Sequence, residues 1–282
     1  MPGPLIGITG ATGHIGRLVA TRLAGTGARL RLLARDPSRL PTLNAPVQVA
    51  RTSYEDTAEA RAALAGVEVL FMVSAAESAD RLAQHTGFLD AAAAAGVRHV
   101  VYTSFLGAAP QATFTLARDH WVTEEHLRSL GLAWTVLRDS FYLDFLPDLA
   151  DPDGAIRGPA GTGRVGAVAR ADVARVAAAV LSAPESHAGA VHEVTGPEAL
   201  TLAEVAETIT RVTGRSTTYV DETIEQAYAS RAVYHAADWQ VDAWVSTYTA
   251  IAKGELATLT GTVQRIGGQP PLSLAELLRS RS

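Results

Sequence analysis

The stretch that decides the fold lies near the N-terminus, at residues 8–16, and reads Ile8-Thr9-Gly10-Ala11-Thr12-Gly13-His14-Ile15-Gly16. It joins a predicted buried strand at residues 5–9 to a predicted helix at residues 13–24. In this spacing Gly10 permits a tight turn, Gly13 lets the backbone approach a pyrophosphate, and Gly16 lets the helix pack closely on the strand. The start of the helix offers free N–H groups and a partial positive charge to phosphates. The stretch therefore predicts a dinucleotide site, with the cofactor-binding residues Thr9, Gly10, Ala11, Thr12, Gly13, His14, Ile15 and Gly16. The other interpretation is a glycine turn that serves packing alone.

Beyond this stretch, short apolar runs alternate with helix-like segments through the first half of the chain. Strands are predicted at residues 5–9, 29–34, 47–50, 67–73, 99–103 and 133–137, and helices at residues 13–24, 55–64, 80–95 and 118–130. Alternation of this kind is typical of a parallel sheet covered by helices on both faces. Because such crossovers are right-handed, the predicted fold class is α/β, with a doubly wound parallel sheet of the Rossmann type.

The alternation stops near Pro147. Residues 148–166 are rich in Gly, Pro and Asp and are predicted to form a loop. A capping-box spacing from Thr201 to Glu204 opens a later helix, which ends at Gly214. The other predicted elements are helices at residues 172–181, 222–230, 237–253 and 273–278 and strands at residues 191–194 and 217–220. We predict a dinucleotide-binding domain at residues 1–146 and a smaller, mainly substrate-binding mixed α/β cap at residues 147–282, with residues 164–196 or so returning to the Rossmann core.

The residues after the second strand bear on the choice of cofactor. Arg35 and Asp36 lie about 20 residues beyond the glycine stretch, where such folds read the adenine ribose. An acid there binds the 2′-hydroxyl of NAD, whereas an arginine pairs with the 2′-phosphate of NADP. Since Arg35 comes first, directly after the strand, the predicted cofactor is NADP, used as NADPH. NAD stays open, because Arg35 can also be a solvated side chain beside a turn begun by Asp36.

Composition restricts the classes of function. The 282 residues include 24 basic and 29 acidic ones, a net charge of −5, so nucleic acid is not an expected partner. The absence of cysteine excludes disulfides and thiolate metal sites, and the eight histidines form no ligand cluster, so no metal is expected. Without a signal-peptide pattern or an apolar run of about 18 residues, the expected protein is cytoplasmic and does not interact with membranes. A homodimer is the commonest form among soluble oligomers and is the default expectation.

Several segments resemble a known family. The stretch at residues 9–16 resembles the start of atypical short-chain dehydrogenase/reductases of the NmrA-like group. Residues 116–120 (Leu-Ala-Arg-Asp-His), 137–142 (Leu-Arg-Asp-Ser-Phe-Tyr) and 251–255 (Ile-Ala-Lys-Gly-Glu) are similar to segments of type 2 NAD(P)H:quinone oxidoreductases and triphenylmethane reductases. The resemblance spans nearly the whole chain. It implies direct hydride transfer from NADPH to a quinone or a similar planar, electron-poor small molecule.

The resemblance also implies which residues contact NADP. Besides the glycine stretch and Arg35, they are residues 74–77 (among them Ser74, Ala75 and Ala76), then Asp139, Ser140, Phe141 and Tyr142, and finally Arg170. Ligands of a doubly wound sheet bind beyond the carboxyl ends of the strands, where Ser74, Ser104 and Asp139 are expected. We therefore add Ser104 to the cofactor-binding residues. The alternative for each of these is an ordinary loop residue.

The chain lacks the Tyr-x-x-x-Lys pair that most short-chain reductases use as their general acid. Lys253 is the only lysine, and by register with the helix before Gly131 the positions of the pair hold Leu116 and His120. An electron-poor acceptor can take a hydride with positioning as the main contribution, and water can supply the later proton. His120 is the predicted catalytic polar group, bonding the ribose or polarising an acceptor oxygen. The other interpretation is a histidine on the helix surface.

Aromatic side chains after the strands are candidates for holding a planar acceptor. Tyr142, counted as catalytic, and Phe141 are expected to stack on the substrate or frame it. Phe105 and Leu106, just past the fifth predicted strand, are expected to line the substrate pocket. The alternative for all four is a place in the apolar core.

These observations leave different functions open. The first is an NADPH-dependent reductase of quinones or related planar acceptors. The second is a non-catalytic NAD(P)-binding redox sensor or regulator of the NmrA type, which the missing Tyr–Lys pair fits equally well. A third is a tailoring reductase acting on one polycyclic metabolite. The C-terminal segments resemble the reductases more, which favours an enzyme.

Overall fold

The structure, a computed structural model, describes residues 3–281. The chain forms two compact units, each built from several separate segments. Unit 1 comprises Met1–Ser104, Asp119–Arg138 and Val173–His192, and unit 2 comprises Phe105–Arg118, Asp139–Asp172 and Glu193–Ser282. The predicted division into residues 1–146 and 147–282 stays a prediction, because a division by contacts does not establish which segments fold independently.

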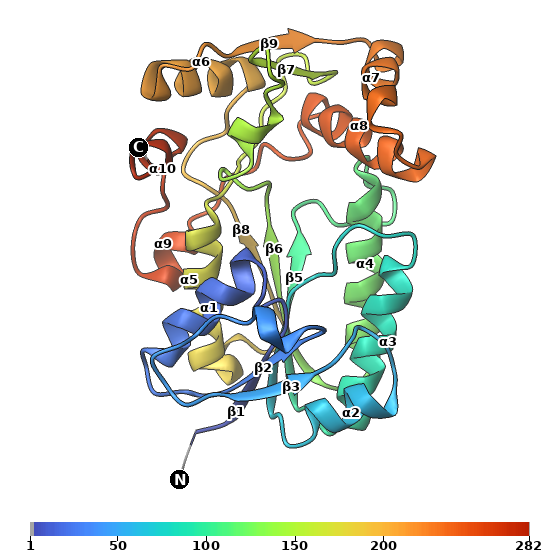
Figure 1. Cartoon of the computed structure of the whole chain (residues 1–282), viewed down its shortest axis with the longest axis vertical. Coiled ribbons are helices and arrows are strands. Elements are labelled where there is room, and N and C mark those ends of the chain that lie inside the picture. Colours follow the sequence, from blue (N-terminus) through green and yellow to red (C-terminus); the bar gives the residue numbers. More distant parts are fainter. Residues whose placement is uncertain (1–2, 282) are drawn as a thin grey trace. The chain divides into compact units, whose positions relative to one another are not determined.

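A seven-stranded sheet forms the centre of unit 1 (Figure 1). Its order is β3-β2-β1-β4-β5-β6-β8. β1 pairs in parallel with β2 and β4, β2 with β3, and β4 with β5. The strands are β1 (Leu5–Ile8), β2 (Arg29–Ala34), β3 (Gln48–Arg51), β4 (Val69–Met72), β5 (His99–Phe105), β6 (Ala133–Asp139) and β8 (Ala190–Val194). The doubly wound α/β fold predicted from the alternation is confirmed. Its strand order reverses between β1 and β4, which is where such folds bind ligands.

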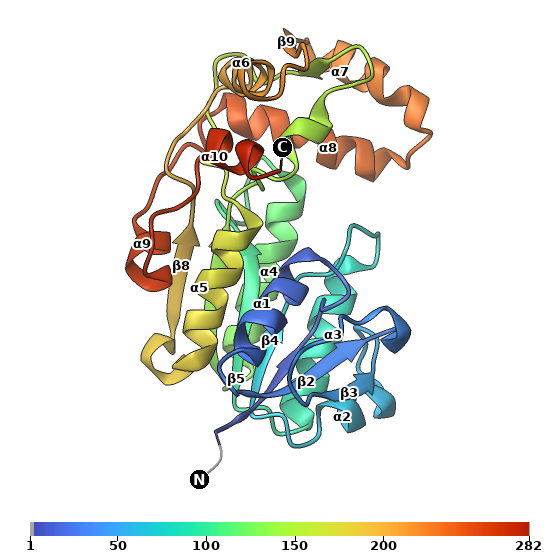
Figure 2. The ribbon, with the colours of Figure 1, turned by 60° about the vertical axis from the view of Figure 1, so that its left-hand side comes forward.

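Helices cover both faces of this sheet, as Figures 1 and 2 show. α2 (Ala58–Leu64), α3 (Arg81–Ala94) and α4 (Thr115–Ser129) lie on one face, and α1 (His14–Ala24) and α5 (Arg170–Ser182) on the other. The first face is sealed by a buried apolar cluster that includes Leu64, Phe88, Leu89 and Leu127. Burial on both faces explains why β1 and β4 are apolar throughout rather than alternating, and every residue of β5 is buried as well.

Three boundaries differ from the expectation in ways that affect the site. β6 continues to Asp139, so Asp139 is the last residue of a strand rather than a residue beyond its end. β5 continues through Phe105, so Ser104 lies inside a strand rather than beyond its end. α4 begins at Thr115 rather than at residue 118, because Ala117 faces the apolar core and extends the helical face backwards. The remaining predicted elements of this half occur with shifts of a few residues at their ends, as fraying ends of helices and strands lead one to expect.

Unit 2 contains a two-stranded parallel sheet, β7 (Ala155–Gly158) beside β9 (Thr218–Asp221). Its helices are α6 (Leu202–Thr213), α7 (Ile224–Arg231), α8 (Asp238–Ala252), α9 (Thr262–Gly267) and α10 (Leu274–Arg279). Short 3-10 turns occupy η1 (Pro37–Arg39) and η3 (Pro184–His187) in unit 1, and η2 (Leu146–Leu149) and η4 (Ala232–Tyr234) in unit 2. The prediction of a loop over residues 148–166 is wrong at β7, and α9 was not predicted. The predicted capping box of Thr201 and Glu204 is confirmed, as is the end of α6 at Gly214, where φ is 75°.

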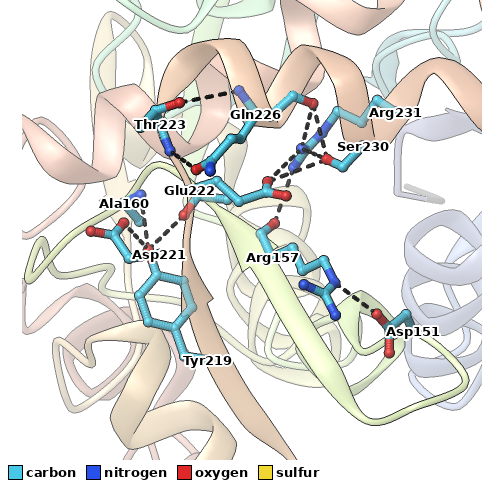
Figure 3. A network of polar contacts seen from close by, with 12 residues as sticks. Asp151, Arg157, Ala160, Tyr219, Asp221, Glu222, Thr223, Gln226, Ser230 and Arg231 are labelled. Carbon is cyan, nitrogen blue, oxygen red and sulfur yellow. Dashed lines mark hydrogen bonds and ion pairs between the residues drawn. The ribbon is translucent and has the colours of Figure 1, made fainter.

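A buried polar cluster ties α7 to the small sheet (Figure 3). Arg231 Nη1 lies 3.2 Å from Glu222 Oε2, and Nη2 donates to the carbonyl of Arg157 at 3.1 Å. The guanidinium of Arg231 also stacks on the ring of Tyr248, 4.9 Å from its centroid. Since both members of the ion pair are almost fully buried, the cluster holds the helix to the strand mainly through satisfied hydrogen bonds.

None of the helices among residues 3–281 is both long and apolar enough to span a membrane.

Candidate cofactor and acceptor site

The glycine stretch forms the turn that its sequence predicts. Gly10 has a φ of 64°, in the region that favours glycine, and its carbonyl accepts a hydrogen bond of 2.9 Å from the N–H of Gly13. A Cβ on Gly16 would lie 2.4 Å from the carbonyl carbon and oxygen of Gly10. The helix thus crosses the turn at a distance that only glycine allows.

The first turn of α1 fits a phosphate group. Its N-cap, Gly13, provides no side-chain cap, and no acidic residue occupies the first turn. A Cβ on Gly13 would meet nothing closer than the Gly10 carbonyl oxygen at 3.4 Å, so the space in front of the helix is open. His14 is exposed at this end, while Ala11 and Ile15 bury their side chains and can offer only backbone groups. The open backbone and the helix dipole together favour an anion here.

Thr9 joins the glycine turn to the neighbouring strand. Its hydroxyl donates to the carbonyl of Phe71 at 3.2 Å and accepts from the N–H of Val73 at 2.9 Å. The phenol of Tyr54 lies 2.6 Å from the same oxygen and 2.5 Å from the carbonyl of Val73. The N–H of Thr9 also donates to the carbonyl of Phe71, at 3.0 Å, so both its side chain and its N–H are used inside the protein. Contact of Thr9 with a cofactor stays a prediction.

Arg35 lies directly after β2 and is exposed, as predicted. The neighbouring Asp36 caps the next turn, with its Oδ1 accepting from the hydroxyl of Ser38 at 2.6 Å and from the N–H of Ser38 at 3.1 Å. These hydrogen bonds hold the pKa of the Asp36 carboxyl below its usual value. Because the acid is engaged in its own turn, Arg35 is the better placed of the two to meet a 2′-phosphate.

The segment after β4 begins against the glycine turn, since a Cβ on Gly10 would lie 2.9 Å from the Cβ of Val73. The N–H of Ser74 donates to Thr103 Oγ1 at 2.8 Å, which fixes the start of the segment. Ser74 and Ala75 are half-buried and Ala76 is exposed. Unit 1 therefore brings together the glycine stretch and residues 74–76, two of the predicted cofactor-binding groups.

The predicted catalytic histidine is buried. His120 is 5% exposed, with Nδ1 2.8 Å from the Tyr102 phenol and Nε2 2.9 Å from Arg81 Nη2. Burial and the charge of Arg81 lower the pKa of His120 well below its usual value. The interpretation of His120 as a surface histidine is wrong. A catalytic role for it stays a prediction, and both of its ring nitrogens already have partners.

Ser104 is also engaged. Its hydroxyl donates to Glu124 Oε1 at 2.6 Å, and both residues are buried. Glu124 is held in turn by Arg138, whose Nε and Nη2 lie 2.8 and 2.7 Å from the two carboxylate oxygens. The prediction that Ser104 contacts the cofactor now rests on its place near the end of β5 alone.

Unit 2 holds the predicted residues from the end of β6 onward, beginning with Asp139. The Tyr142 phenol donates to Asp139 Oδ2 at 2.7 Å, and the Arg170 guanidinium stacks on the Tyr142 ring, 4.9 Å from its centroid. Burial raises the pKa of the Asp139 carboxyl to about 7, although the hydrogen bond from Tyr142 acts in the opposite direction. The hydroxyl of Ser140 is buried without a hydrogen-bond partner among the described residues, as expected of a group that bonds a ligand.

The aromatic side chains predicted to hold an acceptor form a cluster in unit 2. The ring centroid of Phe105 lies 5.0 Å from that of Phe114 and 5.1 Å from that of Phe141. Phe105, Leu106 and Phe114 are buried, whereas Phe141 is half-buried. Contact of Phe105, Leu106 or Phe141 with an acceptor stays a prediction, and Phe141 is the most accessible of the three.

Sequence reasoning missed several residues that support the site. No sequence motif includes Tyr54, Arg81 or His85. Phe114 follows a predicted loop, where no pattern marks it. One signal was present: Arg81 and His85 stand four apart on the helical face that also carries Phe88 and Leu89, and polar residues on an apolar face imply partners. Among the described residues, no group of three His, Cys, Asp or Glu side chains could hold a metal ion.

A doubly wound sheet with an uncapped helix behind a glycine turn defines a Rossmann dinucleotide-binding protein. The NAD(P)H-binding family matches residues 10–184 of the chain. Quinone oxidoreductase 2 of Escherichia coli (strain K12) is 33% identical over 278 residues, 96% of either chain. The NAD(P)H azoreductase of Xenophilus azovorans is 30% identical over 282 residues, 99% of this chain and 98% of the relative.

Solved structures agree with the sequence relatives. The NADPH complex of the E. coli NADPH-dependent quinone oxidoreductase has a TM-score of 0.89 at 32% identity, covering 98% of this chain and 99% of that one. The Citrobacter sp. triphenylmethane reductase in complex with NADP(H) has a TM-score of 0.87 at 27% identity, covering 98% and 100%. The chain belongs to the NAD(P)H-binding family and, within it, to the NmrA-like quinone reductase group. It is an NAD(P)H-dependent oxidoreductase.

Proposed function

We propose that the protein is an NADPH-dependent reductase that delivers a hydride directly to a quinone or a related planar, electron-poor small molecule. The similarity to quinone oxidoreductase 2 over 96% of either chain carries this proposal. The similarity to an azoreductase and to a triphenylmethane reductase extends the acceptor class to flat, electron-poor molecules in general.

The cofactor is NADP(H). The open amides at the start of α1 fit its diphosphate, and the exposed Arg35 fits its 2′-phosphate. When bound, NADPH supplies the hydride and the nicotinamide ring that carries it. The residues predicted to hold it are those of the glycine stretch, Arg35, residues 74–76, Ser104, residues 139–142 and Arg170.

Replacing Arg35 with Ala tests the choice between NADPH and NADH. Loss of a charge-assisted pair with the 2′-phosphate should weaken NADPH binding by about tenfold to a hundredfold and leave NADH nearly unchanged. The measurement is the Kd of each nucleotide by calorimetry. Arg22→Ala, an equally exposed arginine in the last turn of α1, is the matched control. Equal losses for the two nucleotides would refute the assignment.

We propose that the Asp139–Tyr142 pair manages the proton that must follow the hydride. The reduced acceptor needs a proton on oxygen or nitrogen, and the chain has no Tyr-x-x-x-Lys pair to donate it. With a pKa of about 7, the Asp139 carboxyl carries a proton in about half of the molecules at neutral pH. Tyr142, hydrogen-bonded to it, can give its phenol hydrogen to the reduced acceptor and take the proton of Asp139 in exchange.

The direct test is consumption of NADPH with a panel of acceptors that includes a simple benzoquinone and a triphenylmethane dye. We expect turnover without added flavin. An NAD(P)-binding regulator, the alternative function, would bind NADP and NADPH with different affinities and turn over no acceptor. Such a result would contradict the proposal that the protein is a reductase.

Two further properties are kept as proposals. A homodimer is the default for a soluble oligomer and is tested by light scattering on the purified protein. A cytoplasmic location follows from the expected use of NADPH and is tested by cell fractionation.

A further inference from the structure

The backbone of Ala75, in the middle of the segment predicted to contact NADPH, is held by two side chains of α3. Its N–H donates to His85 Nε2 at 2.8 Å, and its carbonyl accepts from Arg81 Nε at 3.0 Å. Arg81 and His85 lie four residues apart, so they share one face of the helix. Neither of the two peptide units that flank the Ala75 Cα can turn away without breaking a hydrogen bond to a buried side chain.

The donors around His85 fix its protonation. A backbone N–H only donates, so Nε2, facing Ala75, is the unprotonated acceptor. The ring proton therefore sits on Nδ1, which lies 3.0 Å from Thr123 Oγ1. The Thr123 hydroxyl is free to accept it, because its own hydrogen goes to the carbonyl of Asp119 at 2.7 Å. Burial lowers the pKa of His85 to about 3, which keeps the ring neutral.

Arg81 is fixed by a second histidine. A guanidinium only donates, so His120 Nε2, at 2.9 Å from Arg81 Nη2, is an acceptor. The proton of His120 is then on Nδ1, which donates to the phenol oxygen of Tyr102 at 2.8 Å. Arg81 Nη1 lies 3.5 Å from Asp119 Oδ2, which balances its charge. The support for Ala75 thus reaches back to β5 and α4.

We propose that His85 and Arg81 are positioning residues for the cofactor: they fix the two peptide units that flank the Ala75 Cα and so present Ser74, Ala75 and Ala76 to NADPH. Tyr102 and His120 act one step behind them by holding Arg81. This inference rests on the proposed function. In this role both ring nitrogens of His120 keep their hydrogen bonds, whereas direct contact with an acceptor would require one of them to be released.

Two substitutions of His85 separate positioning from general stability. Glutamine places its terminal amide near the position of Nε2, so His85→Gln can still accept from the Ala75 N–H. Asparagine is one methylene shorter and reaches only the position of Nδ1, so His85→Asn can keep the Thr123 contact but loses Ala75. Both variants keep a polar group at the site, and both leave the glycine turn and Arg35 untouched.

His99→Asn is the matched control. His99 is also a buried histidine of unit 1, with Nε2 2.9 Å from Thr135 Oγ1. It begins β5, so it lies at the N-terminal end of the parallel strands, whereas the segment after β4 lies at their C-terminal end. Changing it costs buried packing and a hydrogen bond without touching Ala75.

The experiment measures the Kd of NADPH by calorimetry and the Tm of the full-length protein. We expect His85→Asn to raise the Kd about tenfold, and His85→Gln to stay within about threefold of the unchanged protein. His99→Asn should lower the Tm and leave the Kd unchanged. Equal Kd values for His85→Asn and His85→Gln would overturn the proposal, as would Kd losses that follow the Tm across all three variants. Absence of NADPH binding by the unchanged protein would instead contradict the proposed function.

Discussion

At the scale of single residues, two glycines of the same turn have different roles: one allows close packing and the other leaves space for a ligand. A Cβ on Gly16 would lie 2.4 Å from the Gly10 carbonyl group, a distance that real structures do not tolerate, whereas a Cβ on Gly13 finds its nearest neighbour at 3.4 Å. We therefore expect Gly16→Ala to destabilise the fold by about 1–3 kcal/mol or more through overpacking. Gly13→Ala should leave the Tm nearly unchanged and weaken NADPH binding, because its methyl group occupies the space predicted for the pyrophosphate.

Thermal unfolding without nucleotide and calorimetry with NADPH check this pair. Since both variants add the same methyl group to the same turn, each serves as the control for the other. The assignment of a phosphate site is contradicted if Gly13→Ala binds NADPH as tightly as the unchanged protein.

The Asp139 carboxyl gives the activity a pH dependence that can be worked out in sign. If its protonated form donates, kcat/KM falls as the pH rises through about 7. Tyr142→Phe should lower kcat/KM at every pH because the phenol that delivers the proton is lost; it also removes a hydrogen bond that favours the charged carboxylate, so the fall of the remaining activity should move to higher pH. Asp139→Asn should abolish this fall of kcat/KM with pH. The measurement is kcat/KM for a benzoquinone between pH 5.5 and 9, a range chosen to bracket the pKa.

The same carboxyl affects stability, and the direction follows from linkage. Its pKa in the folded protein, about 7, lies above the unfolded value of about 3.9, so the folded state binds more protons between these values. The contribution of Asp139 to stability is therefore fully present at low pH and is lost as the pH rises toward 7. As the pH rises across this window, the free energy of unfolding of Asp139→Asn should increase relative to that of the unchanged protein, by at most about 1.4 kcal/mol per pH unit. A constant difference in free energy of unfolding would contradict the raised pKa.

Positions that depend on local sequence could be predicted, and environments that depend on distant partners could not. Gly10, Gly16 and Arg35 act within a strand, a turn and a helix that are contiguous in the chain. The buried state of His120 depends on Tyr102 and Arg81, which lie 18 and 39 residues away. His85 is recognised only once α3 is placed over the end of β4.

At the scale of elements, α7 offers a test of what a buried ion pair contributes. Glu222→Ala leaves Arg231 buried without its carboxylate, next to the Arg157 carbonyl (Figure 3) and the Tyr248 ring. Loss of one partner of a buried pair costs about 3–5 kcal/mol. We expect the Tm to fall accordingly in thermal unfolding.

The control lies in the same cluster. Arg157→Ala removes an ion pair with Asp151 whose arginine is 44% exposed, and such pairs contribute no more than about 1 kcal/mol. The carbonyl of Arg157 that accepts from Arg231 is kept in this variant. Similar losses of stability for Glu222→Ala and Arg157→Ala would show that burial of the Arg231 pair does not matter.

The sequence failed to predict elements that local signals do not define, such as a strand held by pairing with a segment far away in the chain. β7 is four residues long, lies in a stretch rich in Gly, Pro and Asp, and exists because it pairs with β9 more than 60 residues later. α9 has six residues and begins after Gly261 without a side-chain cap, whereas the equally short α10 is marked by the capping box of Ser273 and Glu276. In contrast, α1 and α6 carry their own end signals, a glycine turn and a capping box, and their limits were predicted to within one residue.

At the scale of the whole molecule, the chain passes repeatedly between its two units, and this bears on how it can be divided. A fragment of residues 1–146 lacks α5 and β8, although α5 covers one face of the sheet and β8 borders β6 (Figure 2). We therefore expect this fragment to unfold without a cooperative transition, because apolar surface of the sheet and one edge of β6 stay uncovered. Thermal unfolding followed by circular dichroism, with dye binding to exposed apolar surface, measures this.

A second fragment, residues 1–196, contains every segment of unit 1 and is the control. It should regain a cooperative transition and some affinity for NADPH, since the glycine turn, Arg35 and residues 74–76 are present with α5 and β8 to cover the sheet. If instead the shorter fragment unfolds cooperatively and binds NADPH as the full chain does, the predicted boundary between residues 146 and 147 is a true domain boundary. In that case α5 and β8 would add to a sheet that is already stable, rather than complete it.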